Sequence, residues 1–178
     1  MADSSESREC EVQRTDEWGQ TNRIPLFLSN YSSAQKAQYN RLMSLAAKQA
    51  ELIDDLNLIE NAQERLAALT SYVAKTRLPE EQKGDDLIVP GCVSRVWVKG
   101  RVKDGLTEFR CSADSPMVAG LVALLCDLYS DVSPWEAAEV EPELWTRCGF
   151  TKILSPTRLN GLSAVRGRIR ELASHWKA

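Results

Sequence analysis

The strongest constraint on the fold is an Asp-Gly pair between two runs of β-forming residues. The run VSRVWVKGRVK (93–103) precedes Asp104-Gly105, and LTEFRCSA (106–113) follows it. Asp-Gly is a favoured two-residue loop in a type I′ hairpin turn, since both positions need a positive φ. The resulting register pairs Val102 with Thr107, Gly100 with Phe109, Val98 with Cys111 and Val96 with Ala113. One face of the hairpin is then small and apolar, so we expect it to face the core, with Cys111 as a buried thiol.

A stripe of residues spaced three and four apart predicts helices before the hairpin. The helical pattern begins at Ser33, Asn61-Ala-Gln-Glu64 resembles a capping box that divides it in two, and Leu78-Pro79 ends the second helix. The stripe consists of Leu42, Leu45, Gln49, Leu52, Leu56, Ile59, Gln63, Leu66, Thr70 and Val73. Gln49, Gln63 and Thr70 make this stripe too polar for a good coiled-coil interface, so two helices packed on a core are favoured.

After the hairpin, Asp114-Ser115-Pro116 is typical of a helix start, and we expect Asp114 to be the N-cap. The segment MVAGLVALLCDLY (117–129) is apolar on nearly all sides. This pattern predicts a central buried helix, in which Cys126 has a structural role.

Three shorter signals complete the predicted fold. Ser133-Pro-Trp-Glu136 is a second capping box, residues 141–147 form one more turn ended by Gly149, and Ser155-Pro156 opens a last helix that runs to about Trp176. The expected fold class is α+β, a small antiparallel β-sheet with helices packed against it.

We expect one domain over residues 33–178, with an additional N-terminal helix over 33–56 and a core over 57–178. Residues 1–32 are polar and acidic and are predicted to be a flexible tail. The tail has no apolar signal core and the chain has no run long enough for a membrane span, so a cytoplasmic protein with no membrane partner is expected.

Charge and cysteine usage exclude several classes of function. The 178-residue chain has a net charge of −3, which is unlike the basic footprint of a nucleic-acid binder. Its cysteines are odd in number and widely spaced: Cys10, Cys92, Cys111, Cys126 and Cys148. With His175 as the only histidine, neither a disulfide scaffold nor a structural zinc site is expected.

Cys92 follows a Pro90-Gly91 pair that suits the middle of a type II turn. Such a turn predicts the thiol on a loop tip, where a partner protein can reach it. A useful thiol also needs electropositive help, for which Arg95, Arg158 and the arginines of the last helix are candidates. The alternative is that Cys92 is a small apolar residue at the start of a strand.

Three blocks of sequence resemble the SufE family, which includes CsdE: VPGCVSRVWV (89–98), ADSPMVAGLVALL (113–125) and LSPTRLNGL (154–162). Together with Arg77-Leu78-Pro79 at a helix end, the resemblance covers about residues 57–178. The chain departs from the family pattern at Lys75, where a glycine is usual, and in its N-terminal extension.

The resemblance implies a sulfur acceptor in iron–sulfur cluster assembly, with an α+β fold shared with IscU-type scaffolds. Cys92 would take persulfide sulfur from a pyridoxal-phosphate-dependent cysteine desulfurase (SufS/CsdA-like) and pass it to a scaffold complex (SufBCD-like). The protein itself would need no cofactor. Supporting residues by position in the blocks are Gly91, Ser94, Asp114 and Arg158.

Three alternative functions compete with sulfur acceptance: a cluster scaffold, a thiol hydrolase and an activator. An IscU-type scaffold needs several converging ligands, and a Cys–His hydrolase needs a base beside the thiol, for which the chain offers only His175. The third is an activator or adapter of the desulfurase in which Cys92 relays no sulfur.

Overall fold

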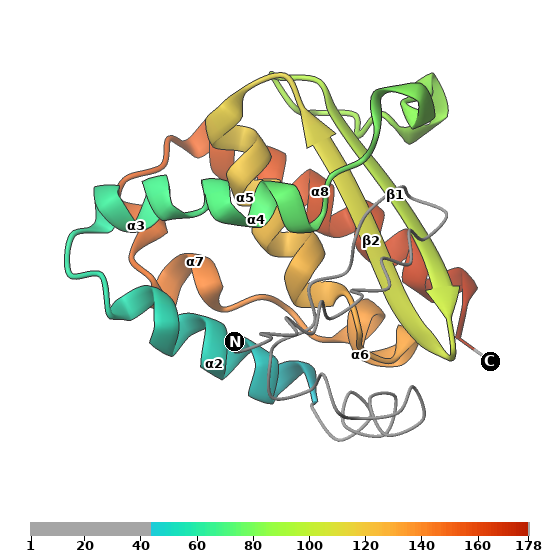
Figure 1. The fold of residues 1–178 in the computed structure, drawn as a ribbon, viewed down its shortest axis with the longest axis horizontal. Coiled ribbons are helices and arrows are strands. Elements are labelled where there is room, and N and C mark those ends of the chain that lie inside the picture. The colour runs from blue at the N-terminus through green and yellow to red at the C-terminus, as the bar shows by residue number, and fades with distance from the viewer. Residues whose placement is uncertain (1–43, 178) are drawn as a thin grey trace, which may run out of the picture. The chain divides into compact units, whose positions relative to one another are not determined.

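The computed structural model describes residues 44–177, and it confirms the predicted α+β class. Figure 1 shows a long two-stranded hairpin with helices packed against it. The elements are α2 (Leu45–Asn57), α3 (Ala62–Ala68), α4 (Thr70–Lys75), the 3₁₀ turns η2 (Glu80–Gln82) and η3 (Asp85–Leu87), β1 (Val96–Lys103), β2 (Leu106–Ala113), α5 (Pro116–Tyr129), α6 (Pro134–Glu139), α7 (Leu144–Arg147), η4 (Phe150–Lys152) and α8 (Pro156–His175). The predicted tail (1–32) and residues 33–43 lie outside the described residues.

The hairpin forms with the predicted turn and register. Asp104 and Gly105 have φ values of 54° and 80°, as a type I′ turn requires. All four predicted cross-strand pairs are present in the antiparallel ladder of β1 and β2. Gly100 has a further role, because a Cβ there would lie 2.7 Å from Phe109 and 2.8 Å from Trp176. Only glycine leaves room for these two aromatic rings to meet across the strand.

Helix α5 is the centre of the core, as predicted. It packs against β2, α2, α3, α4 and α8, and every residue from Gly120 to Tyr129 is buried. In Figure 1 it runs through the middle of the molecule, between α4 and α8. Cys126 is fully buried in this helix and Cys111 is 5% exposed on β2, so both predictions of core thiols are confirmed.

The N-terminal helices differ from the prediction in their boundaries. Ser44 is extended and caps α2 at Ala47, so the described helix begins at Leu45. The Asn61 side chain accepts hydrogen bonds from the Gln63 and Glu64 amides, as a helix start requires. The second helix is interrupted at Leu69 into α3 and α4 and ends at Lys75, before Leu78-Pro79.

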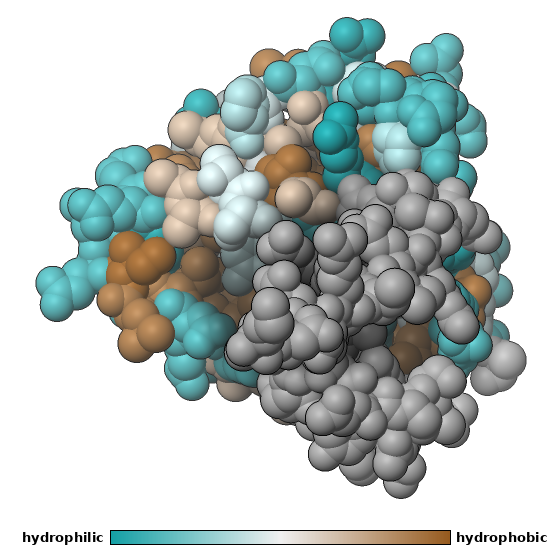
Figure 2. Space-filling model, viewed as in Figure 1, coloured by the Kyte–Doolittle hydropathy of each residue, from teal (hydrophilic) through white to brown (hydrophobic). Residues whose placement is uncertain are grey.

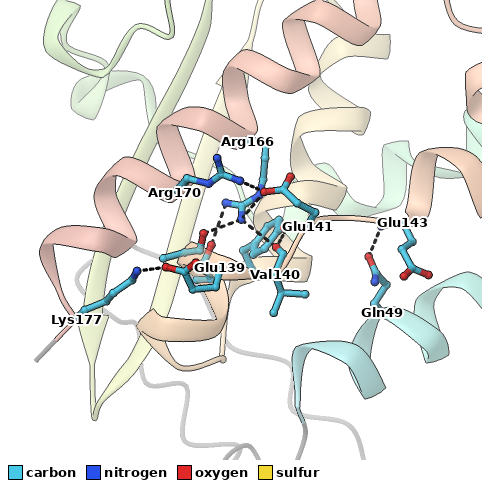
Figure 3. A network of polar contacts seen from close by, with 11 residues as sticks. Gln49, Glu139, Val140, Glu141, Glu143, Arg166, Arg170 and Lys177 are labelled. Carbon is cyan, nitrogen blue, oxygen red and sulfur yellow. Dashed lines mark hydrogen bonds and ion pairs between the residues drawn. The ribbon is translucent and has the colours of Figure 1, made fainter.

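Long-range hydrogen bonds attach these helices to the C-terminal half of the chain. The Leu45 amide donates to Glu136 Oε1 (2.9 Å), and the Glu143 amide donates to Gln49 Oε1 (2.7 Å), a contact visible in Figure 3. Buried Arg65 donates to the carbonyl oxygen of Cys148 (2.5 Å). The Glu136 carboxylate therefore binds the start of α2. Its backbone amide donates to the Ser133 hydroxyl, so Ser133 caps α6 as predicted.

Most cationic residues of α8 and of the segment after it are bound to other groups of the protein. Arg166 is buried and donates to three backbone carbonyls at the end of α6, while its guanidinium lies over the Tyr129 ring. Arg168 pairs with Glu171, Arg170 with Glu141, and Lys177 with Glu139. Figure 3 shows Arg166, Arg170 and Lys177 directed toward α6 and the segment after it. These side chains therefore attach α8 to α6 and to the segment that follows it.

The surface in Figure 2 shows small hydrophobic patches between hydrophilic residues. Among the helices of residues 44–177, none combines the length and apolar character of a membrane span.

Candidate functional site

Cys92 lies in the loop between the Pro90-Gly91 turn and β1, and its thiol points toward α8. Gly91 has a φ of 85°, the value that the third position of a type II turn requires. The Cys92 Sγ donates a hydrogen bond to the carbonyl oxygen of Gly161 at 3.5 Å. The side chain lies on a loop, as predicted, and is half-buried, which the turn alone does not decide. Packing of the loop on α8, which local sequence does not report, is the reason.

The thiol stands at the edge of a cavity of about 300 Å³ between this loop, α5 and α8. Apolar side chains form its walls: Val93, Val96, Val118, Leu121, Val122, Leu162 and Val165. Hydroxyl groups and one guanidinium lie at its other positions: Ser94, Ser115, Ser155, Thr157 and Arg158. Cys92 is the one cysteine lining this cavity in the part of the chain that the structure describes. The cavity can therefore hold a small apolar group beside the sulfur.

The walls around the thiol come mainly from outside its own loop. Val89 and Trp97 are buried and do not line the cavity, whereas Val93 lines it although its side chain is 86% exposed. Helices α5 and α8 supply most of the other walls. Burial raises the pKa of Cys92, so the thiol is mostly protonated at neutral pH while it stays in this position.

Asp114 and Arg95 have roles other than those predicted. The N-cap of α5 is Ser115, whose side chain makes no capping bond, so the expectation of Asp114 as N-cap is wrong. The Asp114 carboxylate instead accepts a hydrogen bond from Arg95 Nε at 2.9 Å. The Arg95 guanidinium also lies 5.4 Å from the Trp97 ring, so this pair fixes the far end of the cysteine loop to the start of α5. Because Arg95 pairs with Asp114, it does not serve as the free cation that was expected to assist the Cys92 thiol.

Arg158 and Ser94 are in the cavity lining, as a role beside Cys92 requires. Arg158 is in the first turn of α8, exposed, and without an ion-pair partner among residues 44–177. It can therefore meet an anionic sulfur group or an acidic partner at the mouth of the cavity.

The geometry does not favour the hydrolase or the cluster scaffold. His175 is exposed and fourteen residues beyond Gly161 in α8, which is about 21 Å along the helix axis. A base at that distance cannot deprotonate Cys92. No group of three or more His, Cys, Asp or Glu side chains converges as a metal site within residues 44–177.

A family model described as "SufE: Fe-S metabolism associated domain" matches residues 50–173. The chain belongs to the SufE family. It is 30% identical over 129 residues to an uncharacterised SufE-like protein of Rhizobium etli, covering 69% of this chain and 87% of the relative. A SufE-like protein of Synechocystis is 29% identical over 141 residues, which are 79% of this chain and 84% of the relative.

The SufE fold is also seen in a solved structure. The solution structure of a hypothetical protein from Thermus thermophilus matches with a TM-score of 0.60 at 22% identity, covering 72% of this chain and 95% of that one. Membership of the SufE family associates the chain with iron–sulfur metabolism.

The three blocks of the SufE resemblance meet at the Cys92 cavity. They supply the cysteine loop, the start of α5 and the start of α8. Sequence reasoning missed Gly161 as the residue that receives the thiol, although it is part of the LSPTRLNGL block. The glycine itself was the available signal, because a residue without a side chain lets another segment pack closely against a helix.

Gly161→Val is expected to expose Cys92. A Cβ at this position would lie 3.6 Å from the Cys92 Sγ, so the further methyl groups of valine would occupy the space of the thiol. We expect Cys92 to react several-fold faster with iodoacetamide in the native protein, measured on peptide 84–95. Gly167→Val is the matched control on the same helix, because nothing lies within 4 Å of a Cβ there. Equal rates in both variants would show that Gly161 does not hold the thiol.

Proposed function

We propose that the protein accepts sulfur on Cys92 from a cysteine desulfurase and passes it to an iron–sulfur cluster scaffold. The single observation that supports this most is a lone thiol at the mouth of an apolar cavity, in a member of a family associated with iron–sulfur metabolism. The three SufE-like sequence blocks converge on that thiol.

The transfer step is an exchange between sulfur atoms. The Cys92 thiolate attacks the outer sulfur of the persulfide on the desulfurase cysteine. A new S–S bond forms on Cys92, the old S–S bond breaks, and the desulfurase cysteine leaves as a thiolate. The exchange needs no external oxidant or reductant, so no redox cofactor of the acceptor takes part. Pyridoxal phosphate, which the desulfurase carries, acts earlier and on free cysteine.

The local structure suits an acceptor better than a stand-alone enzyme. At rest the raised pKa and half-burial of Cys92 disfavour attack on chance electrophiles. A single hydrogen bond of 3.5 Å joins the thiol to α8. Rotation of the Cys92 side chain toward a partner protein would therefore break only this one weak bond. Among the described residues, no second cysteine lines the cavity to displace the outer sulfur and close a disulfide. The cavity beside the thiol has room for the added sulfur atom and would shield it from oxidation.

The surface around the loop offers contacts to a partner. Val93 is 86% exposed and Met117, in the first turn of α5, is 41% exposed. Exposed apolar side chains beside a reactive group are typical anchors in transient interfaces. We infer that the desulfurase covers Val93 when Cys92 enters its active site.

Mass spectrometry on the full chain tests the proposal. After incubation with a SufS/CsdA-like desulfurase and cysteine, the tryptic peptide 84–95 should gain about 32 Da, the mass of one sulfur atom, and lose it with dithiothreitol. Peptide 111–147, which carries two other cysteines, is the internal control and should be unchanged. Absence of added sulfur on Cys92, with binding of the desulfurase demonstrated, would favour the activator without sulfur relay.

A further inference from the structure

The Cys92 cavity contains polar groups to which transfer from a desulfurase assigns no role. Among the described residues of its lining, Arg158 is the one charged side chain, and none is acidic. The hydroxyls of Ser94, Ser115 and Thr157 line the same cavity and have no hydrogen-bond partner within residues 44–177. The Arg158 guanidinium also has no partner there. Several free donors and no carboxylate therefore surround one space beside a thiol.

The charge around this space favours an anion. The chain has a net charge of −3, whereas Arg158 gives the cavity lining a positive charge. Ser115 and Ser155 are the N-caps of α5 and α8, so both helices begin at the cavity. The first turn of a helix has free backbone amides and a partial positive charge. The carboxylate next to Ser115 in sequence, Asp114, is already paired with Arg95.

The size and the apolar walls of the cavity restrict which anion fits. Its volume of about 300 Å³ is at the lower end for small-ligand sites. Val118, Leu121 and Val165 are among its walls, and they suit a polarisable sulfur atom better than a hydrated oxygen. A guanidinium and hydroxyls, in contrast, bind the oxygen atoms of an anion. A small anion with sulfur at one end and oxygen atoms at the other matches both parts of the lining.

We propose that Cys92 also takes sulfur directly from a small sulfur oxyanion, of which thiosulfate is the simplest, without a desulfurase. Arg158 and the free hydroxyls bind the oxygen atoms, and the terminal sulfur lies toward Cys92. The Cys92 thiolate attacks that sulfur, the S–S bond of thiosulfate breaks, and sulfite leaves with the electron pair. Cys92 becomes a persulfide, and its thiol proton goes to solvent. The exchange needs no oxidant or reductant.

This inference rests on the proposed role of Cys92 as a sulfur acceptor and adds a second class of donor. A desulfurase must cover the loop and draw the thiol toward its own active site. A small oxyanion can instead enter the cavity while the thiol keeps its contact with Gly161. The two donors therefore place different demands on the protein, and Arg158 is the residue on which the small donor depends.

The experiment uses the full wild-type chain and sodium thiosulfate, with no desulfurase present. After alkylation, we expect peptide 84–95 to be heavier by about 32 Da, the mass of one sulfur atom, and sulfite to be released in equal amount. A parallel sample receives a desulfurase and cysteine instead. Sulfur from the desulfurase but not from thiosulfate would overturn this inference and leave the proposed function intact. Sulfur from neither donor would overturn both, and sulfur from thiosulfate alone would support only this inference.

Two variants test the anion site itself. Arg158→Gln should slow sulfite release about tenfold, as expected when a hydrogen bond between charged groups is lost. Lys152→Gln is the matched control, because Lys152 is also exposed and cationic but is not in the cavity lining. It should release sulfite at the wild-type rate.

Alkylation of Cys92 gives a second readout that needs no sulfur transfer. The rate with anionic iodoacetate, divided by the rate with neutral iodoacetamide, should fall in Arg158→Gln and stay unchanged in Lys152→Gln. A general loosening of the cysteine loop would change both rates equally and leave this ratio unaltered. Equal ratios and equal sulfite release in the two variants would show that Arg158 does not bind the anion, and would overturn the proposal.

Discussion

Cys92→Ser is expected to abolish sulfur acceptance and to leave the fold intact. A serine hydroxyl has the shape of the thiol but cannot attack a persulfide sulfur at neutral pH, because it is not ionised there. The side chain is only half-buried and makes one hydrogen bond of 3.5 Å, so stability should change little. With a desulfurase and cysteine, we expect no added sulfur on peptide 84–95 and no acceleration of sulfide release by the variant.

The matched control is Cys10→Ser, which removes one thiol at a position remote in sequence from the Cys92 loop. It should accept sulfur at the wild-type level. Binding of the desulfurase to Cys92→Ser should be measured in parallel, by calorimetry. Full acceleration of the desulfurase by the variant would contradict the sulfur relay and support the activator.

Arg166→Met is expected to lower the free energy of unfolding by about 3 kcal/mol, since buried carbonyls that lose their donor each cost about 1–3 kcal/mol. The Arg166 guanidinium donates hydrogen bonds to the carbonyl oxygens of Ala137, Ala138 and Val140 (Figure 3). It also lies 4.5 Å from the Tyr129 ring centroid. Methionine keeps the apolar stem and removes all of these bonds, so the contact between α6 and α8 is weakened.

Urea unfolding of the two variants Arg166→Met and Arg170→Met measures this effect. Arg170 is about one turn further along α8 and half exposed, and its ion pair with Glu141 is at the surface. A surface pair contributes less than about 1 kcal/mol, so Arg170→Met should unfold near the wild-type midpoint. Equal loss in both variants would mean that net charge, and not the buried hydrogen bonds of Arg166, stabilises this region.

The elements that depend on neighbouring residues were predictable. The hairpin register follows from Asp104-Gly105, because the turn needs two residues with positive φ and the pairing then has no freedom. The buried helix α5 follows from an apolar segment with no polar face. The helix starts at Asn61, Ser133 and Ser155 follow from side chains that accept the free amides of the first turn.

Predictions that required a partner distant in sequence were wrong or incomplete. Asp114 is suited to cap α5, but Arg95, 19 residues away, binds its carboxylate instead. In the sequence, Arg166 looks like the exposed arginines near it in α8. It is a buried donor because the end of α6 and Val140 after it place their carbonyl oxygens beside its guanidinium. Side-chain chemistry permits both roles in each case, and packing decides between them.

The Cys92 site shows the same division. From the sequence alone came the turn, the thiol and the three blocks that indicate the SufE family. Only the tertiary structure brings the thiol to Gly161, 69 residues away, and places the apolar walls of α5 and α8 around it. The reason is physical: turn geometry and helix periodicity are properties of adjacent residues, whereas the burial of a thiol, and with it the raised pKa of Cys92, depends on which distant helices enclose it.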